Sequence, residues 1–357
     1  MKVLYVAPEH VSGGFELFAE GHRRRGNDAR WVTFFRNLYG FKEDICFDLI
    51  GMPTSPWVYS FKKRMRLGDQ REFPDGAPLF RRSENLLEKT LFAFRDALNA
   101  PRLRRTIEKY GLNDFDIYHF EQGADPFRDS RWVRELARRG KGIVCFYHGT
   151  DLRNRGAFEA VHRLAKLNLT SEIDLLDRFP DMRYLYLPIN VDRLKPSYRP
   201  PDGRIRICHA ARNRAYKGSD IIESIVFKLA KRYPIDWLMI ENLPHAEAIN
   251  LKATADIFID QITDSGGWGY GASSVEALAL GLPTVTRINS HVEAFLGVHP
   301  FINADMETLE RRLIELVENP DLRVEKGREG RNWVTERHGL DAVMGTLYAY
   351  YREVGFC

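Results

Sequence analysis

Cysteine is scarce in this sequence, and its few cysteines lie far apart. Cys46, Cys145, Cys208 and Cys357 form no Cys-x-x-Cys pair and have no histidine nearby at zinc-finger spacing. We therefore expect no metal site and no cofactor. Free thiols are typical of a reducing compartment, so the cysteines favour a cytoplasmic protein.

Long apolar runs are also missing. No run reaches the ~20 residues that a membrane-spanning helix needs. The apolar stretch in residues 1–8 is too short for a signal peptide, and it predicts a buried strand instead. The sequence thus predicts a cytoplasmic protein that is able to touch the inner face of a membrane.

A strong charge imbalance is absent as well. The 357 residues include 53 basic and 49 acidic side chains, and this net charge of +4 does not indicate a nucleic-acid-binding protein. Hydrophobic residues make up 44% of the chain and charged residues 29%, as in folded proteins rather than disordered ones. A chain of this length predicts two domains of ordinary size.

Short apolar runs alternate with helical stretches along the chain, which indicates βα units and parallel sheets. A segment with three prolines, residues 194–203, interrupts the alternation and predicts a linker. We therefore expect an α/β fold with two Rossmann-like domains, in residues 1–193 and 204–337, whose parallel sheets face a central cleft. Ligands of such sheets bind beyond the carboxyl ends of the strands.

The expected elements follow from these runs. Strands are expected at 3–7, 30–34, 115–120, 142–147, 167–170, 184–187, 205–210, 235–240, 257–260 and 284–286. Helices are expected at 15–25, 86–98, 102–110, 131–139, 219–232, 245–255, 273–280, 306–317, 322–334 and 340–354, and residues 38–85 are expected to be mostly loop.

A pair of glycines, Gly13 and Gly14, lies between the first expected strand and the first expected helix. Glycines at a helix start let the backbone approach a phosphate, although a tight βα turn alone would also explain them. The pair is not the Gly-x-Gly-x-x-Gly pattern of dinucleotide-binding proteins, because no third glycine follows at the right spacing. This argues against a dehydrogenase.

His148 follows an apolar strand directly, within the segment His148-Gly149-Thr150-Asp151. A histidine at the end of a strand is able to hydrogen-bond a sugar hydroxyl. The alternative is a purely structural turn in which Asp151 caps the next helix.

Two cations, Arg212 and Lys217, flank the loop after the first strand of the second domain. The loop opens a helix near Gly218, so the cations and the helix N-terminus together suit a diphosphate group. An ordinary solvated basic loop is the alternative.

A glycine-rich loop, residues 266–271, precedes another helix in the second domain, and Gly269, Tyr270 and Gly271 end it. Glu276 lies in the first turn of that mostly apolar helix. A carboxylate there either stabilises the helix N-terminus or accepts hydrogen bonds from a ribose diol. We favour the ribose, because burying the carboxylate without a partner is costly.

Taken together, these segments resemble the family 4 glycosyltransferases of the GT-B fold, over nearly the whole chain. The most specific match is the string from Glu276 to Pro283, which is similar to the family's E-A-M-A-x-G-x-P signature. The other matching segments are Gly13-Gly14, Asp116-Ile117-Tyr118-His119, His148-Gly149-Thr150-Asp151, Pro188-Ile189-Asn190-Val191-Asp192 and Arg212 with Lys217-Gly218.

The resemblance implies a role for each matched residue. Arg212 and Lys217 would hold the donor diphosphate and assist its departure, and Glu276 would bind the ribose. Contacts with the base, the transferred sugar or the phosphates would come from Glu241, His245, His148, Gly269, Tyr270, Gly271, Gly13 and Gly14. The last helix, within residues 340–357, would cross back onto the N-terminal domain.

The resemblance further implies a retaining, metal-independent hexosyltransferase that uses a UDP- or GDP-sugar, as in polysaccharide biosynthesis. One residue departs from the family: Trp268 stands where a second glutamate usually contacts the donor sugar. Asp264 or backbone amides would then make that contact, or the sugar preference differs.

The acceptor is expected to be a saccharide or a lipid-linked glycan. Residues 57–66 mix aromatic and basic side chains and predict contact with an anionic membrane surface, with an ordinary solvated segment as the alternative. Two other classes of protein stay open at this point, a nucleotide-sugar epimerase of the same fold and a degenerate sugar-binding protein.

Overall fold

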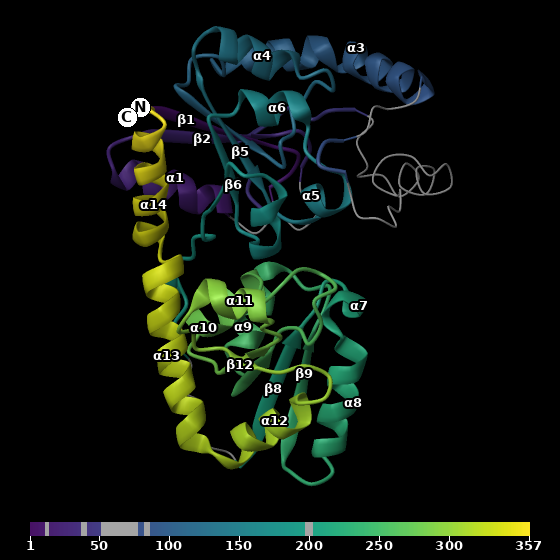
Figure 1. Cartoon of the computed structure of the whole chain (residues 1–357), viewed down its shortest axis with the longest axis vertical. Coiled ribbons are helices and arrows are strands. Elements are labelled where there is room, and N and C mark those ends of the chain that lie inside the picture. Colours follow the sequence, from purple (N-terminus) through teal and green to yellow (C-terminus); the bar gives the residue numbers. More distant parts are fainter. Residues whose placement is uncertain (11–13, 37–40, 51–77, 82–85, 197–202) are drawn as a thin grey trace. The chain divides into compact units, whose positions relative to one another are not determined.

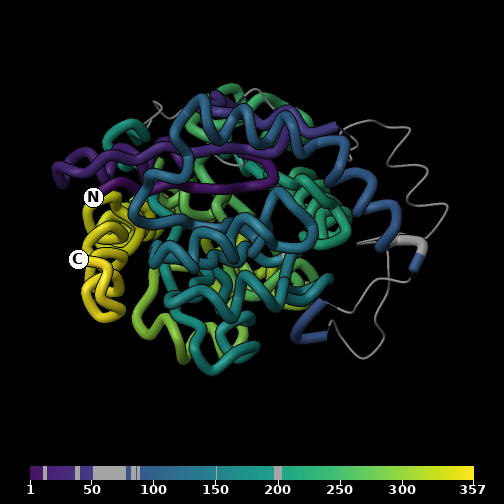
Figure 2. The backbone as a smooth tube through the Cα atoms, turned by 90° about the horizontal axis from the view of Figure 1, so that it is seen from above, coloured from purple at the N-terminus to yellow at the C-terminus, as the bar shows by residue number. Residues whose placement is uncertain are grey.

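The computed structural model describes residues 1–10, 14–36, 41–50, 78–81, 86–196 and 203–357 (Figure 1). These residues form two compact units. Unit 1 comprises Met1–Leu185 together with Met344–Cys357, and unit 2 comprises Tyr186–Val343. Because the end of the chain returns to unit 1, both termini belong to it, and Figures 1 and 2 show them near each other.

Unit 1 contains a sheet of seven parallel strands in the order β3-β2-β1-β4-β5-β6-β7. Its central strands are almost wholly buried, because helices cover both faces, as is usual for parallel sheets. The strands are β1 (Lys2–Ala7), β2 (Asp28–Thr33), β3 (Ile45–Cys46), β4 (Ile117–Glu121), β5 (Gly142–Tyr147), β6 (Leu167–Thr170) and β7 (Met182–Tyr184).

The two faces of this sheet are covered by different helices, since successive side chains of a strand point to opposite faces. Leu4 and Val6 face a large core that includes Leu103 of α3 (Leu86–Lys109), Trp132 of α4 (Arg131–Arg138) and Val161 of α6 (Glu159–Leu164). The shorter helices α5 (Thr150–Asn154) and η2 (Ile173–Arg178) follow β5 and β6.

The opposite face packs against α1 (Gly14–Arg24) and α14 (Leu340–Glu353). The hydroxyl of Tyr348 lies 2.9 Å from Nδ1 of His22 and accepts a hydrogen bond of 2.8 Å from Asn27. Tyr351 is hydrogen-bonded to His119 of β4 and is fully buried. The final helix is therefore an integral part of the core of unit 1.

Unit 2 contains a sheet of five parallel strands in the order β12-β11-β10-β8-β9. Ile207, Ile257 and Ile259 face α8 (Ser219–Leu229) and α12 (Leu309–Glu318) on one side of the sheet, and Cys208 and Phe258 face the opposite core. The strands are β8 (Ile205–Ala210), β9 (Ile235–Ile240), β10 (Ile257–Ile259), β11 (Thr284–Thr286) and β12 (Ile302–Asn303).

Eight helices of unit 2 lie in the described part of the chain before the last helix. They are η3 (Val191–Arg193), α7 (Arg214–Lys217), α8 (Ser219–Leu229), α9 (His245–Lys252), α10 (Ala272–Ala279), α11 (Ser290–Leu296), α12 (Leu309–Glu318) and α13 (Pro320–His338).

The expected fold class is confirmed, since both sheets are parallel and helices alternate with strands. Some elements were predicted wrongly. The two helices expected at 86–98 and 102–110 are one helix, α3, which continues through Pro101. The proline removes one backbone donor, but Asn99 and Leu103 are both buried on the same side of the helix, so packing on either side of Pro101 keeps the helix continuous.

The loop expected between Arg212 and Gly218 contains the short helix α7, and the strand expected at 184–187 is β7, which ends at Tyr184. β3, β12, α6 and α11 were not predicted from the sequence. Strands of two residues show no alternation from which they could be recognised.

Candidate functional site

The candidate site in unit 2 lies at the carboxyl ends of its parallel strands, where the loops after β8, β9 and β10 meet. Asp260 directly follows β10 and is fully buried. Its carboxylate is paired with Lys217 and accepts hydrogen bonds from the Ser274 hydroxyl (2.6 Å) and the Gly271 amide (3.2 Å). One carboxylate thus joins the predicted diphosphate lysine to the end of the glycine loop.

The charge state of Asp260 follows from these partners. Burial alone would raise the pKa of its carboxyl, but Lys217 and the hydrogen bond from Ser274 outweigh burial and hold the pKa below its usual value. Asp260 is therefore ionised and serves as a buried counter-ion for Lys217.

The turn around Lys217 is closely packed. Gly218 separates α7 from α8 with a φ of 72°, and a Cβ atom at this position would lie 2.7 Å from Cγ1 of Ile262. Asn213 caps α7 through hydrogen bonds from the amides of Ala215 (3.1 Å) and Tyr216 (3.3 Å). The tight turn brings Lys217 to the N-terminus of α8, as expected.

The two other predicted residues of this region are Arg212 and Glu241. The Arg212 side chain precedes α7 and is exposed. Glu241, after β9, lies 3.5 Å from the guanidinium of Arg214, which also pairs with Asp220 (2.7 Å) and Glu223 (2.8 Å). Glu241 is therefore part of an acidic cluster around Arg214.

The glycine loop is held in place by a backbone hydrogen bond at Gly269 and by the side chain of Tyr270. The carbonyl of Gly269 accepts a hydrogen bond from the Thr286 hydroxyl (2.8 Å), and the φ of 80° at Gly269 suits glycine. The hydroxyl of Tyr270 lies 3.0 Å from Nε2 of His338, and its ring packs on Phe301. Tyr270 therefore anchors the loop to the interior of unit 2.

Trp268 stands where the resembling family usually has a glutamate, and Asp264 was expected to be able to take over that contact. Both have other partners. The Trp268 ring stacks on His291 at 5.0 Å between ring centroids. Asp264 lies 3.5 Å from Arg287 and accepts a hydrogen bond of 3.3 Å from Asn289.

Glu276 lies in α10 and is mostly buried. One of its carboxylate oxygens is 2.7 Å from Nε2 of His245, and the other accepts a hydrogen bond of 2.6 Å from Lys252. Burial would raise the pKa of Glu276, but the charges of Lys252 and His245 outweigh it and lower the pKa overall. The structure thus brings the predicted Glu276 and His245 together.

The candidate site in unit 1 is a histidine–carboxylate pair at the ends of neighbouring strands. His148 follows β5, and its Nε2 is hydrogen-bonded to Glu121, the buried last residue of β4. Burial would lower the pKa of His148, but Glu121 outweighs it and raises the pKa. The carboxylate of Asp151 accepts a hydrogen bond of 3.0 Å from the His148 amide and does not cap α5, whose N-cap is Gly149.

Of the remaining predicted residues, Gly14 begins α1, and a Cβ atom there would meet nothing within 4 Å. Gly13 and residues 57–66 lie outside the described residues. His119 points into the core toward Tyr351. Over the described ranges, no three His, Cys, Asp or Glu side chains are grouped to hold a metal ion, and no helix is long and apolar enough to cross a membrane.

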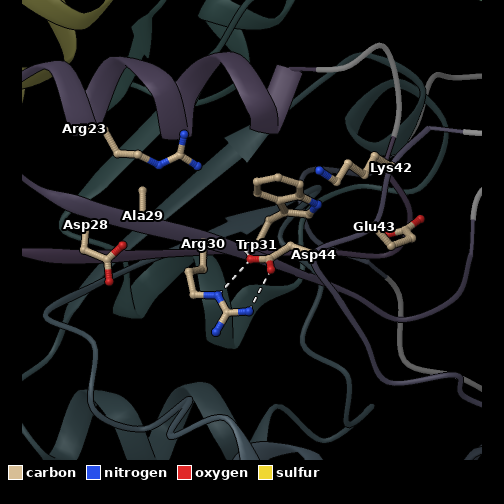
Figure 3. A pocket seen from close by; sticks show the side chains of 8 residues that line it. All are labelled: Arg23, Asp28, Ala29, Arg30, Trp31, Lys42, Glu43 and Asp44. Carbon is tan, nitrogen blue, oxygen red and sulfur yellow. Dashed lines mark hydrogen bonds and ion pairs between the residues drawn. The ribbon is translucent and has the colours of Figure 1, made fainter.

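A hollow of about 420 Å³ lies along β2 in unit 1 (Figure 3). Arg30 and Asp44 form a two-point ion pair across it, with N–O distances of 2.9 and 2.7 Å. None of the predicted site residues lines this hollow. The lining residues are Arg23, Asp28, Ala29, Arg30, Trp31, Lys42, Glu43 and Asp44.

Asp260 and Lys252 were not predicted from the sequence as members of these sites. Asp260 is the last residue of the strand expected at 257–260. An acidic residue at the carboxyl end of a parallel strand is the one feature from which it could have been predicted as a site residue. Lys252 resembled any lysine at the end of a helix.

No family model matches this sequence, and no curated protein matches it. Several solved structures have a similar fold. Sucrose-phosphate synthase from Thermosynechococcus elongatus has a TM-score of 0.60 at 12% identity, with 99% of each chain covered.

A glycosyltransferase from Rickettsia africae has a TM-score of 0.59 at 14% identity and covers 99% of this chain and 98% of its own. HepE from Anabaena, in complex with UDP, has a TM-score of 0.56 at 11% identity and covers 99% of this chain and 100% of its own. The chain therefore has the GT-B fold, with two parallel α/β units, that these glycosyltransferases share.

Proposed function

We propose that this protein is a glycosyltransferase that moves a sugar from a nucleoside-diphosphate sugar to a saccharide or lipid-linked acceptor. The observation that carries the proposal is the grouping of Lys217, the glycine loop and Glu276 at one edge of the sheet in unit 2. The GT-B structures of HepE contain UDP and UDP-glucose, and a donor of that kind suits these groups.

Each part of the donor has a suitable partner in this proposal. Lys217 and Arg212 bind the diphosphate at the N-terminus of α8, where the helix dipole also favours negative charge. Glu276 accepts hydrogen bonds from the ribose hydroxyls. His148, whose pKa is raised by Glu121, donates a hydrogen bond to an oxygen of the transferred sugar.

The mechanism that we propose is retaining and needs no metal. Lys217, Arg212 and the helix N-terminus stabilise the negative charge on the departing diphosphate. The acceptor attacks the face from which the diphosphate leaves, and the phosphate oxygen removes the proton of the acceptor hydroxyl. Trapping a covalent glycosyl–enzyme would contradict this mechanism.

We also propose that unit 1 touches an anionic membrane, which would bring a lipid-linked acceptor near. Leu91, Phe94 and Leu98 are exposed and share one face of α3, and the exposed Arg102 and Arg105 continue that face. Binding to phosphatidylserine vesicles is expected to weaken as salt rises and to weaken further in Phe94→Glu. Equal binding to neutral and anionic vesicles would contradict this contact.

The first experiment is thermal stabilisation by UDP, GDP, ADP and CMP. A ligand at about 100 times its Kd stabilises the folded state by about 2.7 kcal/mol, which shifts Tm by several degrees. Glu276→Ala is expected to lose most of the shift. Glu293→Ala is a matched control, because it removes another Glu–His pair (3.0 Å) on a different helix.

The nucleotide that gives the largest shift is then supplied as a UDP-, GDP- or ADP-sugar with candidate acceptors. Release of the free nucleoside diphosphate with sugar transfer supports the proposal. Epimerised nucleotide sugar as the product would favour an epimerase, and no stabilisation by any nucleotide would refute a donor site in unit 2.

A further inference from the structure

A buried lysine lies beside Glu276. The side chain of Lys252, in the last turn of α9, is 2% exposed, and its ammonium lies 4.9 Å from the centre of the Phe258 ring. The ammonium donates to Glu276 (2.6 Å) and to the Ser273 hydroxyl (2.9 Å) and carbonyl (3.2 Å). Its three N–H donors therefore have three acceptors, so the charge is buried without an unsatisfied donor.

The two oxygens of Glu276 have unlike partners. Oε2 accepts a hydrogen bond from Lys252, whose side chain is buried. Oε1 is bonded to His245, whose side chain is 47% exposed at the start of α9. One oxygen is thus fixed by a buried cation, and the other is bonded to a group that is able to turn into solvent.

We propose that Lys252 is the positioning residue of the nucleotide site, fixing Glu276 so that its Oε1 accepts the ribose hydroxyls once His245 turns away. This inference rests on the proposed function. Without Lys252, the mostly buried carboxylate would lose its strongest counter-charge and would either bind a proton or change rotamer, and both changes remove the acceptor that the ribose needs.

A purely structural role for Lys252 would have a different consequence. Its bonds to Ser273 also tie α9 to the first turn of α10, and loosening that tie would weaken every ligand of the loop to the same extent. A positioning role affects only ligands that carry ribose hydroxyls. The two roles are therefore separated by comparing a nucleotide with its 2′,3′-dideoxy form.

The experiment uses the full chain and titration calorimetry. The probe is whichever of UDP, GDP and ADP stabilises the wild type most, together with its 2′,3′-dideoxy analogue. In Lys252→Met, affinity for the normal nucleotide is expected to fall about tenfold or more, as for a lost hydrogen bond to a charged group. Affinity for the dideoxy analogue is expected to stay within about twofold.

Three further variants make the result specific. Lys228→Met removes an exposed lysine paired with Glu310 in unit 2 and is expected to bind both ligands as the wild type does. In the Lys252→Met, Glu276→Ala double variant, affinity is expected to match that of Glu276→Ala alone, because both changes act on one contact. Ser273→Ala removes one acceptor of Lys252 and is expected to cause a smaller loss of the same kind, even if Lys252→Met does not fold.

The outcomes are distinct. A loss that is equal for the nucleotide and its dideoxy analogue would show that Lys252 only ties the helices together and would overturn the inference. Unchanged nucleotide affinity in Lys252→Met or in Ser273→Ala with its fold intact would also overturn it. If none of the three nucleotides binds the wild type, the proposed function itself is refuted, and this inference falls with it.

Discussion

Replacing Asp260 by alanine would test whether one buried carboxylate holds Lys217 and the end of the glycine loop together in unit 2. The change removes the partner of Lys217 and leaves the Ser274 hydroxyl and the Gly271 amide without their acceptor. Removing one member of a buried ion pair costs about 3–5 kcal/mol. Lys217 is one-fifth exposed and is able to reach water, so we expect about 3 kcal/mol.

The assay is thermal and urea unfolding of the full chain. A loss of about 3 kcal/mol would lower the Tm of a unit of this size by roughly 6–12 °C. Asp260→Asn keeps an acceptor oxygen for Ser274 and Gly271, and we expect it to cost about half as much.

The pH dependence gives a second test of the same pair. Because the pKa of Asp260 is lowered in the folded state, its contribution is present above the usual aspartate pKa of about 3.9 and is lost as pH falls through the folded value. The stability difference between wild type and Asp260→Asn should therefore be constant near neutral pH and shrink in acid. A destabilisation of Asp260→Ala below about 1 kcal/mol would refute the reasoning, because it would mean that the buried charge has no net effect.

Three further predictions concern single contacts. Gly218→Ala should cost about 1–2 kcal/mol in urea unfolding, since its φ is positive and the new Cβ meets a buried isoleucine, whereas Gly271→Ala, with open space and negative φ, should cost far less. Glu121→Gln should lower the pKa of His148 in an NMR titration. The variant should also lose the stability that the pair provides below about pH 6.5 and loses as pH rises through the folded pKa, so an unmoved His148 resonance would contradict the pairing. Tyr351→Phe should destabilise unit 1 by about 1 kcal/mol through the loss of a buried hydrogen bond, and an unchanged unfolding midpoint would show that this bond is not needed.

The strands were predictable because their apolar runs are local features. Residues 142–147 and 205–210 were expected as strands and form β5 and β8 with those bounds. Buried parallel strands are continuous apolar runs, which the sequence displays directly. The break expected before Pro101 was wrong, because the burial of the side chains that keep α3 continuous depends on residues that are close in space and distant in sequence.

The site was predictable only in part, because its charged side chains form ion pairs between residues that are far apart in the sequence. Lys217 pairs with Asp260 and Lys252 with Glu276 at sequence separations of 43 and 24 residues, and no local pattern links them. Glu276 was expected to find its polar partner in a ribose, whereas in the structure Lys252 and His245 already pair with its carboxylate. Lys252 itself, at the end of an ordinary helix, resembled a solvated lysine.

The return of the last helix to unit 1 has a consequence for synthesis on the ribosome. The face of the first sheet that carries Tyr5 and His119 is covered by α1 with its His22 and is completed by Tyr348 and Tyr351, which are made after the whole of unit 2. The 158 residues of unit 2, from 186 to 343, take about 8–30 s at usual elongation rates. Throughout that time the part of this face that α14 covers stays exposed on the nascent unit 1, so a chaperone that binds nascent chains should cross-link to it until α14 has been made.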